Sequence, residues 1–579
     1  MPAVEQRAGH EGHGSGRHDD GPTILATVEA PVRAGDTLAL SPSGALFRMT
    51  VRDLALVFAL VSPVACAAAP EQPADPSAPT APTAPTVDVV ELSAFEARNR
   101  MDIGTLTSRA LTDAYLARIA AIDKAGPILN SVIELNPDAI AEAERLDAER
   151  KGGTVRGPMH GIPVLLKDNI DATGMANSAG SLALADNRPA ADAFIVARLR
   201  AAGAVILGKT NLSEWANFRS TRSTSGWSSR GGQTRNPYVL DRNPCGSSAG
   251  TGTSIAASLA AVGIGTETDG SILCPASVAG LVGLKPTVGL VSRSGIIPIS
   301  ISQDTAGPMT RTVADAAMLL GAVAGVDAAD PSGPAAAGHI PDYLAALKAE
   351  ALTGRRFGVV RQAMGYHPDV DRAMERAIAI ITAAGAVVVD VQVPTYNRWN
   401  QPELDVLLYE FKDGLNAYLA RSASPHKSLE ALIAWNTANK DRAMPFFDQE
   451  LFEQAQAKGP LTDAAYVRAR TAARTLAGRD GLLAVLETQK LDALIAPAMA
   501  PAWPTDHVLG DHFLGAGYGM AAVAGTPSLT VPMGDARGLP LGLAFMGRAY
   551  SEADLLAFGY AFEQKTRARS APTYKPTLD

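Results

Sequence analysis

Apolar and polar positions along the chain follow two periods, and together these predict alternating helices and strands. Spacings of three and four residues predict helices at 91–123, 137–151, 190–202, 311–325, 367–384 and 552–565. Short apolar runs predict strands at 163–166, 204–207, 357–361, 386–391, 493–496 and 528–532. The polar, aromatic-bearing region 399–458 is also predicted to be helical. This alternation is typical of an α/β fold.

The first 88 residues lack this pattern and divide into three segments. Residues 1–48 are polar without clear periodicity, and we interpret them as a non-native or disordered extension. Residues 49–69 have the layout of a secretory signal peptide, with Arg52 near the start just after Arg48, an apolar core at 54–61 and alanines at 67–69. Residues 70–88 are rich in Pro, Ala and Thr, which predicts an extended linker. The folded domain is therefore expected over 89–579.

The signal-like segment predicts an exported protein, periplasmic or secreted. Because a signal normally begins a chain, we expect the natural start at Met49. Cys66 supports an alternative interpretation, in which it is the lipidated cysteine of a lipoprotein, although Pro63 fits poorly where such signals usually carry Leu. A membrane anchor is the third interpretation, but the apolar core is too short to span a bilayer.

Composition and charge indicate what kind of protein this is and which binding partners are unlikely. With 579 residues, 47% of them hydrophobic and 19% charged, the chain has the make-up of a globular protein with a large core. Its net charge of −8, without a basic cluster, argues against nucleic acid as a partner. Its three cysteines, Cys66, Cys245 and Cys274, are too few for a disulfide framework, and no His or Cys spacing indicates a zinc site.

Two serines in the Gly-, Ser- and Thr-rich stretch 245–287 are candidates for chemistry. Ser247 follows Gly246 and Ser271 follows Gly270, on either side of an Ala-rich segment, 253–262, that predicts a helix. Loops of small residues are able to point several backbone N–H groups at one spot, as an oxyanion hole requires. Tight packing or a linker would explain either loop alone. The pair of loops around one helix favours a functional site.

A serine hydroxyl needs a base, and Lys167 is the nearest upstream candidate. An apolar run leads directly into Lys167, so the strand delivers its amine from the core, where burial lowers a lysine pKa. The alternative is an ordinary ion pair with Asp168, and this segment alone would favour that interpretation.

Two further segments match known sequence motifs, but the predicted secondary structure around them does not fit those motifs. Residues 203–210, GAVILGKT, fit the P-loop pattern, yet their apolar strand lies inside the supposed loop, so we interpret the match as false. Residues 246–250, GSSAG, fit the nucleophile elbow of Ser-His-Asp hydrolases, but no strand precedes them. Histidines downstream, such as His367 and His507, keep that hydrolase class open as the weaker option.

Together these segments resemble the amidase signature family. The matching motifs are CGSSAG at 245–250, GTETDGSI at 265–272 and KDN at 167–169, and the stretches TNLSEWANF, SGWSSRGGQTRNP and VGLVSRSGIIPIS are similar to members that act on peptide amides. The resemblance covers roughly 89–579. It implies a single large domain with a mixed central sheet wrapped by helices.

The resemblance also implies a mechanism. Lys167 would take a proton from Ser247, which follows a cis peptide bond at Gly246 and takes one from the nucleophile Ser271. Backbone N–H groups of four residues would form the oxyanion hole: Thr268, Asp269, Gly270 and Ser271. Ser248, Gly246 and Asp168 would support the triad. No metal or cofactor is implied, and Cys245 and Cys274 are expected as packed thiols.

Departures from the family pattern bear on the substrate. Asp269 replaces a glycine, Glu267 replaces an aspartate, and Leu273 stands where many members carry arginine. The resemblance thus implies removal of the C-terminal amide of peptides, with release of ammonia through an acyl-enzyme.

The alternative functions are those of a broad-specificity aryl or aliphatic amidase, an amidotransferase subunit and a non-catalytic amide-binding protein. An export signal argues against the amidotransferase subunit. We expect a monomer or homodimer without a stable membrane span.

Overall fold

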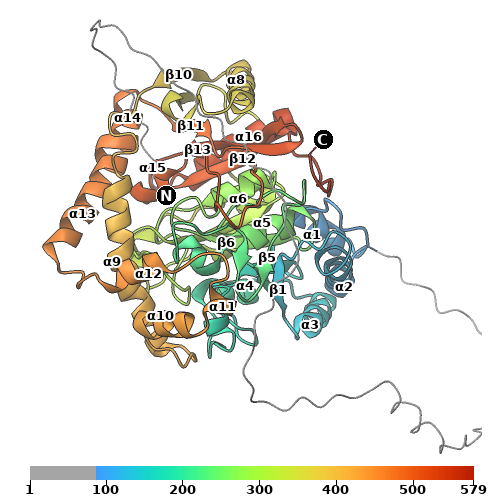
Figure 1. Cartoon of the computed structure of the whole chain (residues 1–579). Helices are drawn as coiled ribbons and strands as arrows, with labels where there is room; N and C mark the ends of the chain where they lie inside the picture. Colours follow the sequence, from blue (N-terminus) through green and yellow to red (C-terminus); the bar gives the residue numbers. More distant parts are fainter. Residues whose placement is uncertain (1–86, 579) are drawn as a thin grey trace, which may run out of the picture. The chain divides into compact units, whose positions relative to one another are not determined.

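The structure, a computed structural model, describes residues 87–578, and a single large sheet lies at its centre (Figure 1). The sheet has 11 strands in this part of the chain. Their bounds are β1 (Val132–Leu135), β2 (Pro163–Lys167), β3 (Val205–Thr210), β6 (Val262–Glu267), β7 (Val282–Lys285), β8 (Thr305–Thr310), β9 (Arg356–Val360), β10 (Val387–Val391), β11 (Ala493–Pro497), β12 (Ser528–Ala536) and β13 (Leu539–Met546). A separate hairpin pairs β4 (Trp227–Ser228) with β5 (Gly232–Gln233).

The sheet is mixed. Its spatial order is β1-β3-β2-β6-β8-β7-β12-β13-β11-β9-β10. Strand β2 runs parallel to both β3 and β6, and β9 runs parallel to β10 and β11, whereas the other neighbours are antiparallel. The mixed central sheet implied by the family resemblance is therefore confirmed.

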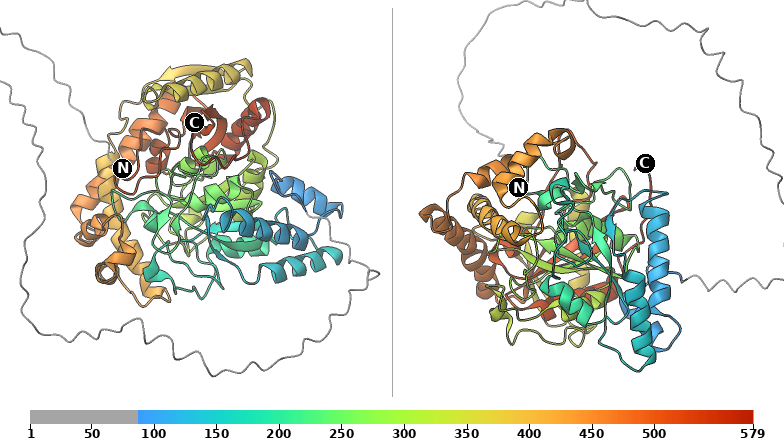
Figure 2. Two further views of the ribbon diagram at one scale, coloured as in Figure 1. Left: turned by 45° about the vertical axis from the view of Figure 1, so that its right-hand side comes forward. Right: turned by 90° about the horizontal axis from the view of Figure 1, so that it is seen from below.

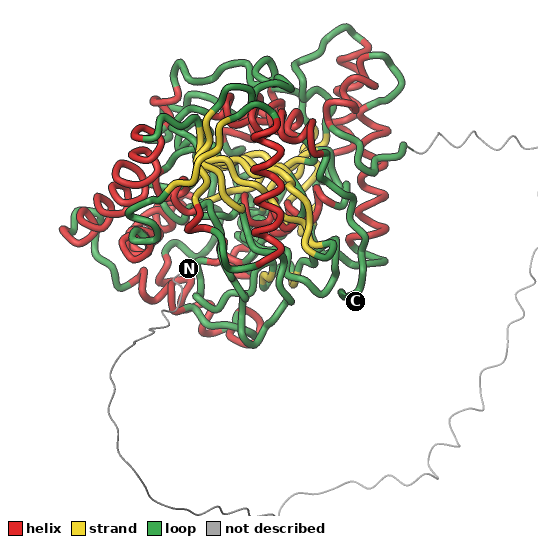
Figure 3. The backbone as a smooth tube through the Cα atoms, turned by 90° about the horizontal axis from the view of Figure 1, so that it is seen from above, coloured by secondary structure: helices red, strands yellow, loops and turns green. Residues whose placement is uncertain are grey.

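Helices lie around the sheet, so that the strands occupy the interior (Figures 2 and 3). Their bounds are α1 (Ala94–Asp102), α2 (Ser108–Arg118), α3 (Ala139–Lys151), α4 (Phe194–Ala201), α5 (Ala249–Ala256), α6 (Leu273–Val278), α7 (Val313–Val323), α8 (Pro368–Ala383), α9 (Asn400–Arg421), α10 (Leu429–Ala438), α11 (Lys440–Ala443), α12 (Glu450–Gln456), α13 (Ala464–Arg474), α14 (Leu483–Thr488), α15 (Gly519–Ala524) and α16 (Glu552–Thr566).

The local sequence explains why these elements form. Every residue of β2 is buried, so this central strand is a continuous apolar run rather than an alternating one. Helix α8 begins at Pro368 after a cap by His367, whose side chain accepts a hydrogen bond from the Asp369 N–H. Its buried positions recur at helical spacing: Val370, Ala373, Met374, Ala377 and Ile381.

The predicted elements are mostly present, with shifted ends. The helix expected at 253–262 begins earlier, as α5 (Ala249–Ala256), and its last predicted residue, Val262, starts β6 instead. The region 399–458 is helical, as predicted, and forms α9 to α12. Five strands of the sheet were not predicted: β1, β6, β7, β8 and β13.

The predicted extension at 1–48, the signal peptide at 49–69 and nearly all of the linker at 70–88 lie outside the described residues. Those assignments stay predictions. Within 87–578, no helix is both long enough and apolar enough to cross a membrane.

Candidate active site

Two adjacent parallel strands bring the candidate site together. Strands β2 and β6 pair in parallel, with Leu166 opposite Ile264. Lys167 ends β2, and Thr266 lies near the end of β6, so both project from the same edge of the sheet. The carboxyl ends of parallel strands are where open α/β sheets place their sites.

Lys167 is fully buried and held by three oxygens. Its Nζ lies 2.7 Å from Ser247 Oγ, 2.9 Å from Thr266 Oγ1 and 3.2 Å from the Thr266 carbonyl oxygen. Burial lowers the pKa of Lys167 from its ordinary value to about 7, although the charges of Asp304 and Glu267 act to raise it. A substantial fraction of the amine is therefore neutral near pH 7, as a general base requires.

The loop before Ser247 is tightly constrained. Cys245 has a φ of 54°, and the Gly246–Ser247 peptide bond is cis, as the resemblance implied. A Cβ on Gly246 would lie 2.2 Å from Ser213 Oγ, so only glycine fits at that position. The Ser213 N–H donates to the Ser247 carbonyl at 3.0 Å. The backbone thereby aims the Ser247 hydroxyl at Lys167.

Ser248 fastens this loop to its neighbours. Its N–H donates to the Ser271 carbonyl at 3.1 Å, which joins the two serine-bearing loops. Its hydroxyl lies 3.1 Å from the Thr266 carbonyl and accepts from the Thr266 N–H at 3.2 Å. Ser248 is thus engaged by backbone groups of β6.

The loop that carries Ser271 lies between β6 and α6. Glu267 braces it, because its Oε2 accepts from the N–H groups of Ile272 at 2.7 Å and Leu273 at 3.0 Å. Gly270 has a φ of 80°, and a Cβ there would lie 2.2 Å from the Tyr518 ring. In residues 87–578, no hydrogen bond uses the backbone N–H groups of 268–271, the four groups predicted for the oxyanion hole.

The structure brings Lys167, Ser247, Ser248 and Ser271 into one site. Lys167 touches Ser247, but no hydrogen bond joins the Ser247 and Ser271 hydroxyls in the part of the chain that the structure describes. Hydrogen bonds of this kind often shorten only when substrate is bound.

Asp168 does not pair with Lys167. Its carboxylate lies 3.4 Å from Lys209 Nζ and 3.2 Å from an Arg230 nitrogen. Lys209 also donates to the Ile170 carbonyl at 2.6 Å. Because Lys209 belongs to β3, the GKT of the P-loop match is part of a buried strand. The interpretation of that motif as false is correct.

Histidines lie elsewhere. His160 contacts the Leu146 carbonyl, His367 caps α8, His507 stacks on Phe446, and His512 lies beside Asp506. Among the described residues, no hydrogen bond connects a histidine to Ser247, Ser248 or Ser271. The contacts of these serines therefore do not fit a Ser-His-Asp hydrolase.

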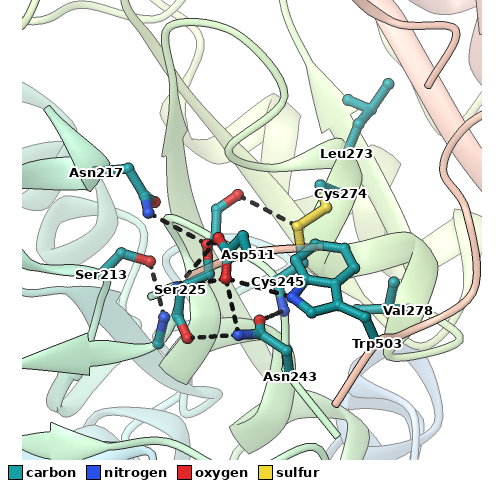
Figure 4. The surroundings of a disulfide bond; sticks show 12 residues. Ser213, Asn217, Ser225, Asn243, Cys245, Leu273, Cys274, Val278, Trp503 and Asp511 are labelled. Atoms are coloured by element: carbon teal, nitrogen blue, oxygen red, sulfur yellow. Dashed lines mark hydrogen bonds between the residues drawn. A yellow bond between two sulfur atoms is a disulfide. The ribbon is translucent and has the colours of Figure 1, made fainter. Parts of the chain in front are cut away.

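The expectation of packed thiols was wrong for the two cysteines beside the site. Cys245 and Cys274 form a disulfide, with their Cα atoms 6.0 Å apart (Figure 4). The residues are 29 positions apart, and only the fold brings them within bonding distance.

Sequence reasoning also missed Thr266, Glu267 and Tyr518 as parts of the site. Glu267 stands five positions before Ile272, a spacing at which a carboxylate is able to accept from the N–H groups of the following turn. Thr266 and Tyr518 carried no comparable signal, because their roles depend on contacts across the fold.

A cavity of about 680 Å³ lies beside the loop, on the Thr266–Thr268 side. Asn169, Ile297 and Asp304 line it together with residues of α9, among them Tyr418. Glu403, near the start of α9, accepts a hydrogen bond from Gln303 at 2.8 Å. Burial and the charge of Asp269 raise the pKa of Glu403 to about 8.

Comparison with known proteins decides the family. The model of a family described as amidase matches residues 110–556. The chain belongs to the amidase family. The fold and the resemblance in its motifs agree with this assignment, which makes the protein a hydrolase of amide C–N bonds.

Solved structures are similar to this amidase over most of its length. The native peptide amidase of Stenotrophomonas maltophilia is 54% identical, with a TM-score of 0.80, and the match covers 84% of this chain and 99% of that chain. A peptide amidase in complex with the competitive inhibitor chymostatin is 55% identical, with a TM-score of 0.82, over 83% of this chain and 99% of that chain.

Proteins related by sequence have names that describe two different activities. An Arabidopsis thaliana protein described as a probable amidase is 41% identical over 81% of this amidase and 89% of its own length. Another relative is one of the subunits of the glutamyl-tRNA(Gln) amidotransferase of Chloroflexus aurantiacus. It is 35% identical over 82% of this amidase and 96% of its own length.

Proposed function

We propose that this amidase removes the C-terminal amide of peptides and releases ammonia. The observation that carries the chemistry is the 2.7 Å contact between the buried amine of Lys167 and the Ser247 hydroxyl. The choice of substrate rests on similarity to peptide amidases at 54–55% identity, well above that of the other relatives compared.

The proposed acylation step uses both serines. Neutral Lys167 takes the Ser247 proton as Ser247 takes the proton of Ser271, whose oxygen attacks the amide carbonyl carbon. Negative charge then develops on the carbonyl oxygen, and the unused N–H groups of Thr268 to Ser271 stabilise it. The carbon–nitrogen bond breaks, the proton returns through Ser247 to the leaving nitrogen, and ammonia departs.

Deacylation uses the same proton path, with water in the place of Ser271 and Ser271 in the place of the leaving nitrogen. A water molecule gives its proton through Ser247 to Lys167 and attacks the ester carbonyl of the acyl-Ser271. The ester bond breaks, Ser271 regains a proton, and the peptide leaves as a carboxylic acid. Neither step calls for a metal or a cofactor.

A broad-specificity amidase with the same mechanism is the second candidate, and the Arabidopsis thaliana relative, described only as a probable amidase, favours it. The third candidate function is that of an amidotransferase subunit, which the 35% identical relative from Chloroflexus aurantiacus supports.

Ammonia release from a matched panel distinguishes these functions. The panel contains peptide amides, the corresponding amides of single amino acids, simple aryl and aliphatic amides, and glutamine. We expect the highest kcat/KM for peptide amides. A uniform kcat/KM across the panel would favour the broad amidase, and turnover of glutamine alone would favour the amidotransferase.

We further propose that the protein is exported and reaches an oxidising compartment. The signal-like layout of 49–69 is the first support. The disulfide is the second, because disulfides form and persist mainly outside the reducing cytosol.

A further inference from the structure

The disulfide joins the two loops that carry the candidate catalytic serines. Cys245 precedes Ser247 by two residues, and Cys274 follows Ser271 by three. Figure 4 shows the bond between the sulfur atoms of Cys245 and Cys274. The bridge therefore lies within a few residues of both reacting hydroxyls, rather than at a remote part of the core.

The Cys245 end is anchored by a partly buried polar network. The Cys245 N–H donates to Asn243 Oδ1 at 2.8 Å, and Asn243 Nδ2 lies 3.1 Å from Asp511 Oδ1. Asp511 in turn accepts from the Ser225 N–H at 3.0 Å and the Trp503 indole N–H at 3.3 Å (Figure 4). Cys245 is thus fixed relative to a distant segment of the chain.

The Cys274 end is fixed to the nucleophile loop. Cys274 lies in α6 and is 1% exposed, and its N–H donates to the Gly270 carbonyl at 2.8 Å. A displacement of Cys274 therefore moves the backbone next to Ser271.

The Ser247 loop needs such an anchor. Cys245 adopts a φ of 54°, in the left-handed region that is unfavourable for residues other than glycine. Gly246 packs so closely on Ser213, Asn217 and Ser225 that a methyl group would not fit. A small relaxation of this loop would carry the Ser247 hydroxyl away from Ser271.

We propose that the Cys245–Cys274 disulfide is a positioning element, which sets the separation of the Ser247 and Ser271 hydroxyls and makes the oxidised protein the competent catalyst. This inference rests on the proposed function. Closing the bridge removes two protons and two electrons from the thiols, and an external disulfide accepts them and becomes two thiols. Protein that is still reduced before export is then a poor amidase.

The double variant Cys245→Ala/Cys274→Ala tests the role of the bridge. A loop shift of about 1 Å costs on the order of 100-fold in rate, so we expect kcat to fall by about that factor while KM stays nearly constant. The matched control is Leu555→Ala, which removes a fully buried side chain from α16 and weakens the fold away from the site. Its kcat, measured well below its unfolding temperature, should stay close to that of the wild type.

Reduction of the folded wild type gives the same test without a substitution. Dithiothreitol supplies two electrons and two protons, which leaves two protein thiols and its own cyclic disulfide. Activity should fall in step with the appearance of the two thiols and return on reoxidation. Two free thiols with unchanged kcat, or a double variant as active as Leu555→Ala, would overturn the inference.

A sulfonyl fluoride separates this inference from the proposed function. It modifies a reactive serine through a sulfur–oxygen bond as fluoride leaves, so its rate reports on Ser271 without any amide substrate. We expect fast labelling of Ser271 in the oxidised protein and slow labelling after loss of the bridge. If the oxidised protein hydrolysed no amide but still showed this difference, the proposed function would fail and the positioning role would stand. Equal labelling rates would refute the positioning role alone.

Discussion

At the scale of single residues, the chemistry depends on the charge of Lys167. An exposed lysine titrates near pH 10.4 and is protonated at neutral pH. Lys167 is fully buried, and the lowering of its pKa to about 7 by burial outweighs the opposing charges of Asp304 and Glu267. The sequence already carried this information, because the apolar run before Lys167 predicted a buried strand.

This lowered pKa predicts the direction of the pH dependence. Below a pH of about 7, Lys167 is protonated and unable to accept the Ser247 proton, so kcat/KM should rise with pH through about 7 and then level off. The pH–rate profile of the wild type measures this directly. A profile that falls with rising pH through the same range would contradict the role of Lys167 as the base.

Substitution of Lys167 tests the same role. Lys167→Ala should lower kcat by about 10²–10⁴-fold, the usual contribution of general acid–base catalysis. Lys167→Arg should not restore it, because guanidinium stays charged. As controls, His160→Gln, His367→Gln, His426→Gln, His507→Gln and His512→Gln should each leave kcat within a small factor of the wild type. A histidine variant as inactive as Lys167→Ala would move the chemistry to a Ser-His-Asp site.

At the scale of elements, strand ends and short loops determine where the reactive groups lie. Lys167 ends β2, Thr266 and Glu267 end β6, and Ser271 lies in the turn before α6. Tyr518 fills the space that a side chain at position 270 would need. The turn therefore requires glycine both for its φ of 80° and for its close contact with the aromatic ring.

Gly270→Ala should impair catalysis beyond its effect on backbone strain. Gly538→Ala is the matched control, because Gly538 has a φ of 82° and nothing within 4 Å of an added Cβ. Both variants should lose about 1–2 kcal/mol of stability to the left-handed backbone. Only Gly270→Ala also has to move Tyr518 or the Ser271 loop, so its kcat should fall by about tenfold or more. Equal kcat values for the two variants would show that the Tyr518 contact does not position Ser271.

The same elements show what the sequence allowed us to predict. Continuous apolar runs predicted β2 and β9 correctly, whereas β6 was missed because its sequence, VGIGTE, is rich in glycine and short of apolar side chains. Helix α5 starts before the Ala-rich segment, and its first turn contains Gly250 and Gly252, which have weak helix propensity. Gly250 packs closely against the backbone of Asn211 and Ser131, a tertiary contact that the sequence pattern did not indicate. The disulfide depends on how the chain folds back on itself, which spacing alone did not indicate.

At the scale of the whole molecule, the amidase family model matches residues 110–556. The predictions about export concern the segment before residue 87. If 49–69 is a signal peptide, the exported protein should begin between Ala65 and Pro70. N-terminal sequencing of the protein from its native host measures this start. A mature chain that still carried residues 1–48 would refute both the export and the start at Met49.

The central claim is that amide hydrolysis proceeds through an acyl-enzyme on Ser271. Acid quenching during turnover of a peptide amide, followed by peptide mapping with mass spectrometry, tests it most directly. We predict an added acyl mass on the peptide that contains Ser271, and none in Ser271→Ala, whose kcat should fall at least about 10⁴-fold while its fold stays intact. An acyl group on Ser248, or near-normal turnover by Ser271→Ala, would contradict the account.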